Sequence, residues 1–165
     1  MVVTALDYKG LANDREDRAN SLKSLISPDR RATCDIGAGN NSAGPILANA
    51  ECPPFDVTST SKVQIFYYLY SGATEPKYSG SPAGLCQSEP NPGPIEEKWV
   101  LAGHSGAMTC IQDKDTTGKR GGDRIFITID GINLYVAYAS SASVSYSELY
   151  REAVSDRSEI ISLHH

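Results

Sequence analysis

The sequence predicts an α+β domain in which a mostly antiparallel sheet of five or six strands carries a C-terminal helix and is preceded by an N-terminal amphipathic helix. Three observations support this class. Residues 61–70 form a run rich in β-branched and aromatic side chains. Residues 124–137 hold two alternating apolar runs joined by Asp130-Gly131, which is the pattern of a β-hairpin. Residues 145–148 match a helix-capping box and precede a stretch of helical periodicity.

The N-terminal helix is expected over residues 9–26, where apolar side chains recur at helical spacing around a charged stretch. A proline ends this helix, and the dibasic pair Arg30-Arg31 follows directly. This pair stands between the helix and the first cysteine. We therefore predict that residues 1–31 are a pro-segment helix ending in a dibasic site and that residues 32–165 are a disulfide-stabilised α+β domain.

A second dibasic pair, Lys119-Arg120, lies in a polar, glycine-bearing loop that a protease could enter without unfolding the core. Both pairs resemble the sites that kexin-type proteases cut late in the eukaryotic secretory route. The alternative is that two neighbouring basic residues on an exposed loop occur there by chance.

Short strands are expected at residues 33–38 and 46–50, and two more at 98–102 and 107–112. The 61–70 run is apolar on both faces, which indicates a central strand that is covered twice. The segment from 71 to 96 is rich in proline and glycine and cannot sustain a ladder or a helix. Irregular loops longer than about 12 to 15 residues are usually functional or mobile, so we expect this loop to take part in binding.

The hairpin prediction is specific about register. A two-residue turn at Asp130-Gly131 pairs Ile129 with Ile132, and the alternation then assigns one face of the hairpin to the core. The opposite face carries three candidate binding residues, Phe126, Asn133 and Tyr135.

The C-terminal helix is expected over residues 146–163, with Ser145 as its N-cap and Glu148 at the third helical position. Its apolar residues follow helical spacing, so the helix should pack on the sheet.

The four cysteines form an even set without a CxxC pair, and no histidine lies within four residues of any of them, so zinc-binding spacings are absent and no metal site is expected. The alternatives are four free thiols or two disulfides. We favour disulfides, with Cys34 joined to Cys52 or Cys110 and Cys86 to the remaining cysteine. A glycosylation sequon at Asn40 within a Gly/Asn loop points in the same direction. The first residues contain no apolar signal core, so we expect a presequence to have been removed.

Composition excludes other classes. The chain has 165 residues, enough for one domain, and a net charge of -5 without a basic cluster longer than a dipeptide, so nucleic acid is not an expected partner. No run approaches the about 18 apolar residues that a membrane span needs.

Two segments resemble enzyme motifs. Gly103-His104-Ser105 follows an apolar run and resembles the nucleophile elbow of α/β-hydrolases, but Ala107 occupies the position of the second glycine. We interpret this segment as a strand–turn–strand and keep a secreted serine hydrolase using Ser105 and His104 as the alternative. Residues 35–41 look like the glycine loop of S-adenosylmethionine-dependent methyltransferases but lack the flanking strand and helix. No cofactor is therefore expected.

The layout of a pro-helix ending in Arg-Arg, a small four-cysteine β-rich body and an acidic balance resembles secreted fungal effectors and killer-toxin precursors. This resemblance implies an extracellular protein that acts without catalysis or cofactor by binding a protein or a glycan on a host or competitor cell. Binding would fall on the 71–96 loop, with Tyr78, and on the outward hairpin face. A carbohydrate-binding module of the aromatic-platform type is a further alternative.

Overall fold

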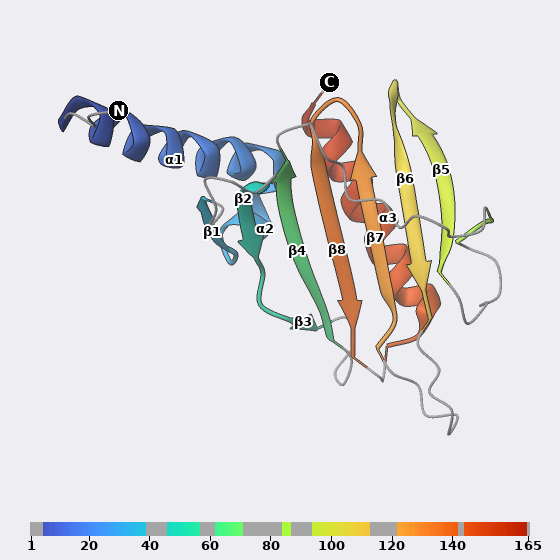
Figure 1. Cartoon of the computed structure of the whole chain (residues 1–165). Coiled ribbons are helices and arrows are strands. Elements are labelled where there is room, and N and C mark those ends of the chain that lie inside the picture. Colours follow the sequence, from blue (N-terminus) through green and yellow to red (C-terminus); the bar gives the residue numbers. More distant parts are fainter. Residues whose placement is uncertain are drawn as a thin grey trace.

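The computed structural model describes residues 5–38, 46–56, 62–70, 84–86, 94–112, 122–141 and 144–164, with side chains from residue 15 onward. Within these ranges the chain forms three helices and eight strands (Figure 1). In chain order they are α1 (Ala5–Leu25), α2 (Pro28–Arg31), β1 (Asp35–Ala38), β2 (Ile46–Glu51), β3 (Phe55–Asp56), β4 (Lys62–Tyr70), β5 (Ile95–Leu101), β6 (His104–Ile111), β7 (Arg124–Ile129), β8 (Leu134–Ser140) and α3 (Tyr146–Leu163).

The strands form one sheet in the order β1-β2-β4-β8-β7-β6-β5, with β3 paired to β4 at the side of this path. Every pairing is antiparallel. The predicted α+β class with a mostly antiparallel sheet is confirmed. The predicted number of strands, five or six, is lower than the eight observed, and the strand without a sequence signal is the two-residue β3, which gains its order by pairing with β4.

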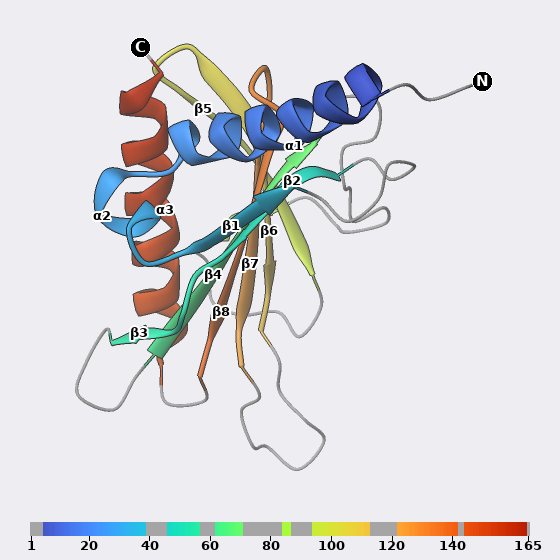
Figure 2. The same ribbon diagram turned by 90° about the vertical axis from the view of Figure 1, so that its left-hand side faces the viewer.

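Helix α3 lies along one face of the sheet, and no helix of the described part lies along the opposite face (Figure 2). Strands β4, β7 and β8 alternate between buried and half-buried residues, as a sheet with one covered face requires. The core between the sheet and α3 is made of buried apolar side chains that include Val63, Ile65, Ile125, Ile127, Val136, Leu149, Ala153 and Ile160.

The predicted C-terminal helix is confirmed at both ends. The Ser145 hydroxyl accepts a hydrogen bond from the Glu148 backbone N–H (3.3 Å), and the Glu148 carboxylate accepts one from the Ser145 N–H (3.2 Å). These two bonds satisfy backbone donors that the first helical turn would otherwise leave without partners. The local sequence therefore fixes where α3 begins.

The predicted two-residue turn at Asp130-Gly131 is wrong. Strands β7 and β8 pair Ile129 with Leu134, so four residues connect them, and Gly131 and Asn133 adopt positive φ values of 84° and 53°. The register is shifted by two residues from the prediction. Because side chains alternate with a period of two, this shift leaves the predicted core face unchanged.

A two-residue turn instead joins β5 and β6. Leu101 pairs with His104, and the two residues between them, Ala102 and Gly103, have φ values of 50° and 81°. Positive φ at both central positions is the geometry that matches the twist of a tight hairpin. The strand–turn–strand interpretation of this segment is thus confirmed.

The N-terminal helix is present, and its C-terminal part is integrated into the core. Leu22 is completely buried and Leu25 nearly so, and α1 contacts β1, β2 and β4. Ile26, directly after the helix, is also completely buried. The other end of α1 runs away from the sheet (Figure 1). The division into a pro-segment 1–31 and a mature domain 32–165 remains a prediction.

Among the described residues, none of the helices combines the length and the apolar composition that crossing a membrane requires.

Candidate binding surfaces

Two disulfides fix the framework on which the candidate surfaces lie. Cys34 is bonded to Cys52 and Cys86 to Cys110, which is one of the two pairings that the sequence left open. The first bridge joins the segment after α2 to the end of β2. The second joins the short segment 84–86 to β6. Each bridge therefore ties irregular chain to the sheet.

The sheet face opposite α3 carries four aromatic side chains that are connected through Tyr135, namely Tyr68, Tyr70, Phe126 and Tyr135 itself, which we call the outer aromatic cluster. Tyr135 lies at its centre. Its ring centroid is 5.7 Å from that of Phe126, nearly parallel to it, and 5.8 Å and 6.0 Å from those of Tyr68 and Tyr70. All four side chains are half-buried. Offset and edge-to-face contacts of this kind hold aromatic rings in defined orientations.

The cluster forms because β8 lies between β4 and β7. Tyr68 is the direct cross-strand partner of Tyr135, and Phe126 lies diagonally across from it on β7. The sequence predicted Phe126 and Tyr135 as binding residues, and the structure brings these two together. The sequence did not single out Tyr68 and Tyr70 as binding residues, because the order of the strands cannot be deduced from local periodicity.

The hydroxyl groups of the cluster remain donors. Burial and the nearby carboxylate of Glu51 raise the pKa of Tyr68, and burial followed by the neighbouring Tyr68 raises that of Tyr70. Both phenols therefore stay protonated at neutral pH. The cluster combines apolar ring area with hydrogen-bond donors at its rim.

Asn133 was predicted to point outward from a strand, and this placement is wrong, since the residue belongs to the connection between β7 and β8. Its carbonyl accepts a hydrogen bond from the backbone N–H of Tyr70 (2.9 Å), so the connection is fastened beside the cluster. The other candidates Tyr78, Asn40, Lys119 and Arg120 lie outside the described residues.

The Ser105 segment has a different geometry from a nucleophile elbow. Ser105 lies on β6 immediately after the hairpin turn, and its hydroxyl donates to the carboxylate of Asp130 (3.2 Å). Residues 99–107 run strand, turn, strand, whereas an elbow needs a strand followed by a helix. Burial first and the charge of His104 second lower the pKa of His164, which caps the C-terminal end of α3.

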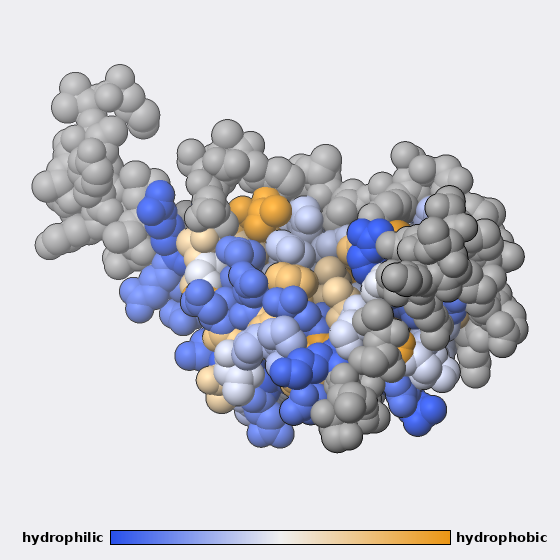
Figure 3. Space-filling model, turned by 90° about the horizontal axis from the view of Figure 1, so that it is seen from below, coloured by the Kyte–Doolittle hydropathy of each residue, from blue (hydrophilic) through white to orange (hydrophobic). Residues whose placement is uncertain are grey.

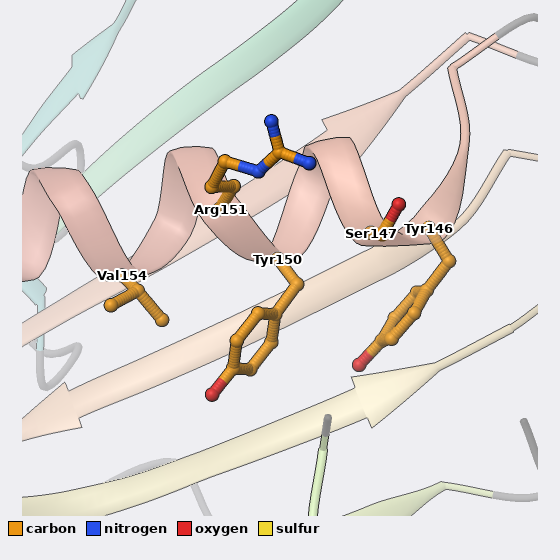
Figure 4. A pocket seen from close by; sticks show the side chains of 5 residues that line it. All are labelled: Tyr146, Ser147, Tyr150, Arg151 and Val154. Carbon is orange, nitrogen blue, oxygen red and sulfur yellow. The ribbon is translucent and has the colours of Figure 1, made fainter. Parts of the chain in front are cut away.

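A pocket of about 280 Å³ lies along the first half of α3 and was not predicted from the sequence. Figure 4 shows the side chains of Tyr146, Tyr150 and Val154 on one side of the helix and those of Ser147 and Arg151 on the other. The helical spacing of the first three residues suggested core positions. This helical spacing is the only sequence signal for the pocket-lining residues, and an ordinary packed helix shows the same spacing.

The pocket wall is anchored to the second disulfide. The Tyr146 hydroxyl donates a hydrogen bond of 2.6 Å to the carbonyl of Cys86, whose own N–H donates to the Glu97 carboxylate (2.7 Å). Burial, then the neighbouring Tyr150, raises the pKa of Tyr146 well above its ordinary value. The rings of Tyr146 and Tyr150, whose centroids lie 6.5 Å apart, form the aromatic part of this pocket, and Arg151 lines it from the other side of the helix.

The face of the molecule seen in Figure 3 is less distinctive. In the view of Figure 3, hydrophobic residues are scattered in small patches among hydrophilic ones, without the extended apolar area that marks many docking faces. Within the described ranges, no group of three or more His, Cys, Asp or Glu side chains is placed to hold a metal ion.

The dibasic pair Arg30-Arg31 forms the end of α2. The guanidinium of Arg31 donates two hydrogen bonds to the carbonyl of Ile26 (2.6 and 2.9 Å), and the guanidinium of Arg30 lies 3.1 Å from the carboxylate of Asp156. Both side chains are therefore engaged within the fold.

Comparison of the chain with protein-family models, with curated proteins and with solved structures finds no match.

Proposed function

We propose that this chain is a secreted recognition protein that binds a protein or a glycan of a host or competitor cell through the outer aromatic cluster and acts without catalysis. The observation that carries the proposal is the cluster itself, four aromatic side chains gathered on the sheet face that no described helix covers. Aromatic side chains are enriched at binding interfaces, because they offer a large contact area and lose little rotamer freedom.

One feature supports a role outside the cell, and a second supports binding through the aromatic cluster. All four cysteines are paired, which is compatible with an oxidising compartment. Both bridges tie irregular segments to the sheet, so the aromatic face stands on a framework that moves little. Preorganisation of this kind lowers the entropic cost of binding.

Binding is tested at the centre of the cluster. Because Tyr135 contacts three other rings, Tyr135→Ala should weaken binding to a cell-surface extract or a glycan array by about 30-fold or more, the effect of losing a central interface residue. Tyr150→Ala is the comparison variant, since Tyr150 is also half-buried but lies in the α3 pocket, so that weaker binding in this variant alone would assign binding to the pocket instead of the cluster. Circular dichroism must show that both variants are folded. Equal binding by the two variants would remove the cluster from the proposal.

Export is tested by mass. Protein isolated from its natural source should react with a thiol reagent at four positions only after reduction, and a glycan at Asn40 should be absent from Asn40→Gln. A new N-terminus at Ala32 is expected if the dibasic pair Arg30-Arg31 is cut. Four free thiols in freshly isolated protein would contradict the export proposal.

A further inference from the structure

Asp156 is a charged residue at a core position of α3, and its side chain is completely buried. One carboxylate oxygen accepts hydrogen bonds from the hydroxyls of Tyr67 (2.9 Å) and Tyr138 (2.7 Å), which come from β4 and β8. The other oxygen lies 3.1 Å from Nε of Arg30. A buried carboxylate is tolerated only when such partners replace the water it has lost.

Arg30 is held by more than this one carboxylate. Its guanidinium lies 3.5 Å from the Glu152 carboxylate and 4.9 Å from the centre of the Phe55 ring, over which it is positioned. Its side chain is 21% exposed. Carboxylates on one side and an aromatic face on the other match the planar, delocalised charge of a guanidinium.

The segment around Arg30 is also fixed on both sides. Upstream, Leu22 and Ile26 are completely buried in the core. Downstream, the carbonyl of Arg30 accepts hydrogen bonds from the N–H groups of Thr33 (3.0 Å) and Cys34 (3.2 Å). The guanidinium of Arg31, by contrast, bonds the carbonyl of Ile26, which belongs to the same N-terminal segment.

We propose that Asp156, Glu152 and Phe55 form a guanidinium-binding site on the domain 32–165, and that Arg30 occupies it to keep the N-terminal segment bound after the chain is cut. Tyr67 and Tyr138 complete the site by holding the Asp156 carboxylate. The inference rests on the proposed processing at the dibasic pair. A protease adds water across the peptide bond that follows Arg31, which leaves a carboxylate on that residue and an ammonium group on the next. Arg30 remains on the N-terminal fragment, so the processed protein is a complex of two chains.

The N-terminal fragment should stay bound because its dissociation would expose buried groups of the domain. Departure of the fragment would expose the cavity that Leu22 and Ile26 fill and would leave Asp156 buried without its cation. Breaking a buried pair by removal of one partner is strongly unfavourable. Hydrolysis after Arg31 removes none of these contacts.

The test uses the full chain with a site-specific protease recognition sequence inserted directly after Arg31, so that a cut is obtained whether or not α2 opens. After cutting with the disulfides intact, both fragments should co-elute in size-exclusion chromatography at neutral pH. The fragments are then separated in denaturant and refolded together with synthetic segment peptides covering residues 15–31.

The peptide of native sequence should rejoin the domain. The Arg30→Met peptide should need an about 100-fold higher concentration for the same recovery of complex, which is the effect of breaking a buried ion pair. The Arg31→Met peptide is the matched control and should agree with the native peptide within about threefold, since it removes an equal charge one residue away. Only the peptides vary, so folding of a mutant domain does not enter the comparison.

Separate elution of the fragments of the cut native protein overturns the inference, as does equal recovery with all three peptides. The result is distinct from the export test. An intact N-terminus in natural material would contradict cleavage after Arg31. The peptide experiment would still show whether the guanidinium-binding site holds the segment in vitro.

Discussion

The two disulfides allow a prediction whose size can be worked out from the structure. The paired residues are 24 positions apart for Cys86–Cys110 and 18 apart for Cys34–Cys52. The loop-entropy relation gives about 3.5 kcal/mol for the first bridge and about 3.2 kcal/mol for the second at 25 °C. Chain entropy alone therefore predicts that replacing either pair with alanine lowers the free energy of unfolding by nearly the same amount.

The burial of the cysteines should decide which of the two bridges contributes more to the free energy of unfolding. Cys86 and Cys110 are 2% and 6% exposed, whereas in the other bridge Cys52 is 5% exposed and Cys34 is only half-buried. Removing a buried sulfur atom leaves space that the core fills only in part, which adds about 1 kcal/mol. We expect the Cys86→Ala/Cys110→Ala protein to lose about 4 to 5 kcal/mol and the other double variant about 3 to 4 kcal/mol.

The assay is urea unfolding followed by circular dichroism, with the slope of free energy against urea recorded for each protein. An unchanged slope shows that the denatured state is comparable, and the midpoints then give the losses. The reasoning fails if either double variant loses less than about 1 kcal/mol, or if the Cys34–Cys52 bridge proves the more stabilising of the two. Reduced native protein should be no more stable than either variant.

Three further predictions use the same assay. Ile26→Ala, directly after α1, should cost about 2 to 5 kcal/mol because the side chain is completely buried, while Lys23→Ala, at an exposed position three residues earlier in α1, should cost less than about 0.5 kcal/mol. Gly106→Ala should cost more than about 3 kcal/mol because its Cβ would overlap the backbone of β7, whereas Gly37→Ala meets no atom within 4 Å and serves as the control. Burial lowers the pKa of His164 below 6.5, so the stability it provides is present above 6.5 and is lost as the pH falls through the lower folded value, which NMR titration and pH-dependent unfolding of His164→Gln can check.

Local signals predicted α3 and the core face of the β7–β8 hairpin, because a capping box and an alternation of period two depend on neighbouring residues only. The turn was wrong for a nonlocal reason. The N–H of Tyr70, far away in the sequence, bonds the carbonyl of Asn133, and β4 pairs with β8 up to Leu134. These contacts place four residues in the connection where the dipeptide Asp130-Gly131 alone favours two.

The disulfide pairing likewise depends on strand pairing that the sequence does not reveal. Asp35 is the antiparallel partner of Glu51, so their neighbours Cys34 and Cys52 face one another at the end of the same ladder. Once β1 and β2 are known to pair, this bridge follows. The outer aromatic cluster has the same origin, since it requires β8 to stand between β4 and β7.

Asp156 is the residue that the helical pattern could not interpret. It occupies a buried place on α3 among apolar residues, and its counter-ion Arg30 comes from the segment that the sequence marks as removable. Burial raises the pKa of Asp156 above 3.8, and Arg30 is the strongest influence opposing that shift. Loss of the segment would therefore raise this pKa further.

Binding of the N-terminal segment and ionisation of the Asp156 carboxyl group are therefore coupled. Because the Asp156 pKa is lower with Arg30 bound than without it, binding of the segment favours the ionised carboxylate, and retention is strongest above the pKa of the vacant site. Affinity then decreases as the pH falls through the interval between the two pKa values. The other titratable groups at this site are Glu152, Glu159, Tyr67 and Tyr138, and Asp156→Asn should remove that part of the dependence which comes from the buried carboxylate. The expected outcome is that the cut segment stays bound at neutral pH and dissociates more readily in acid.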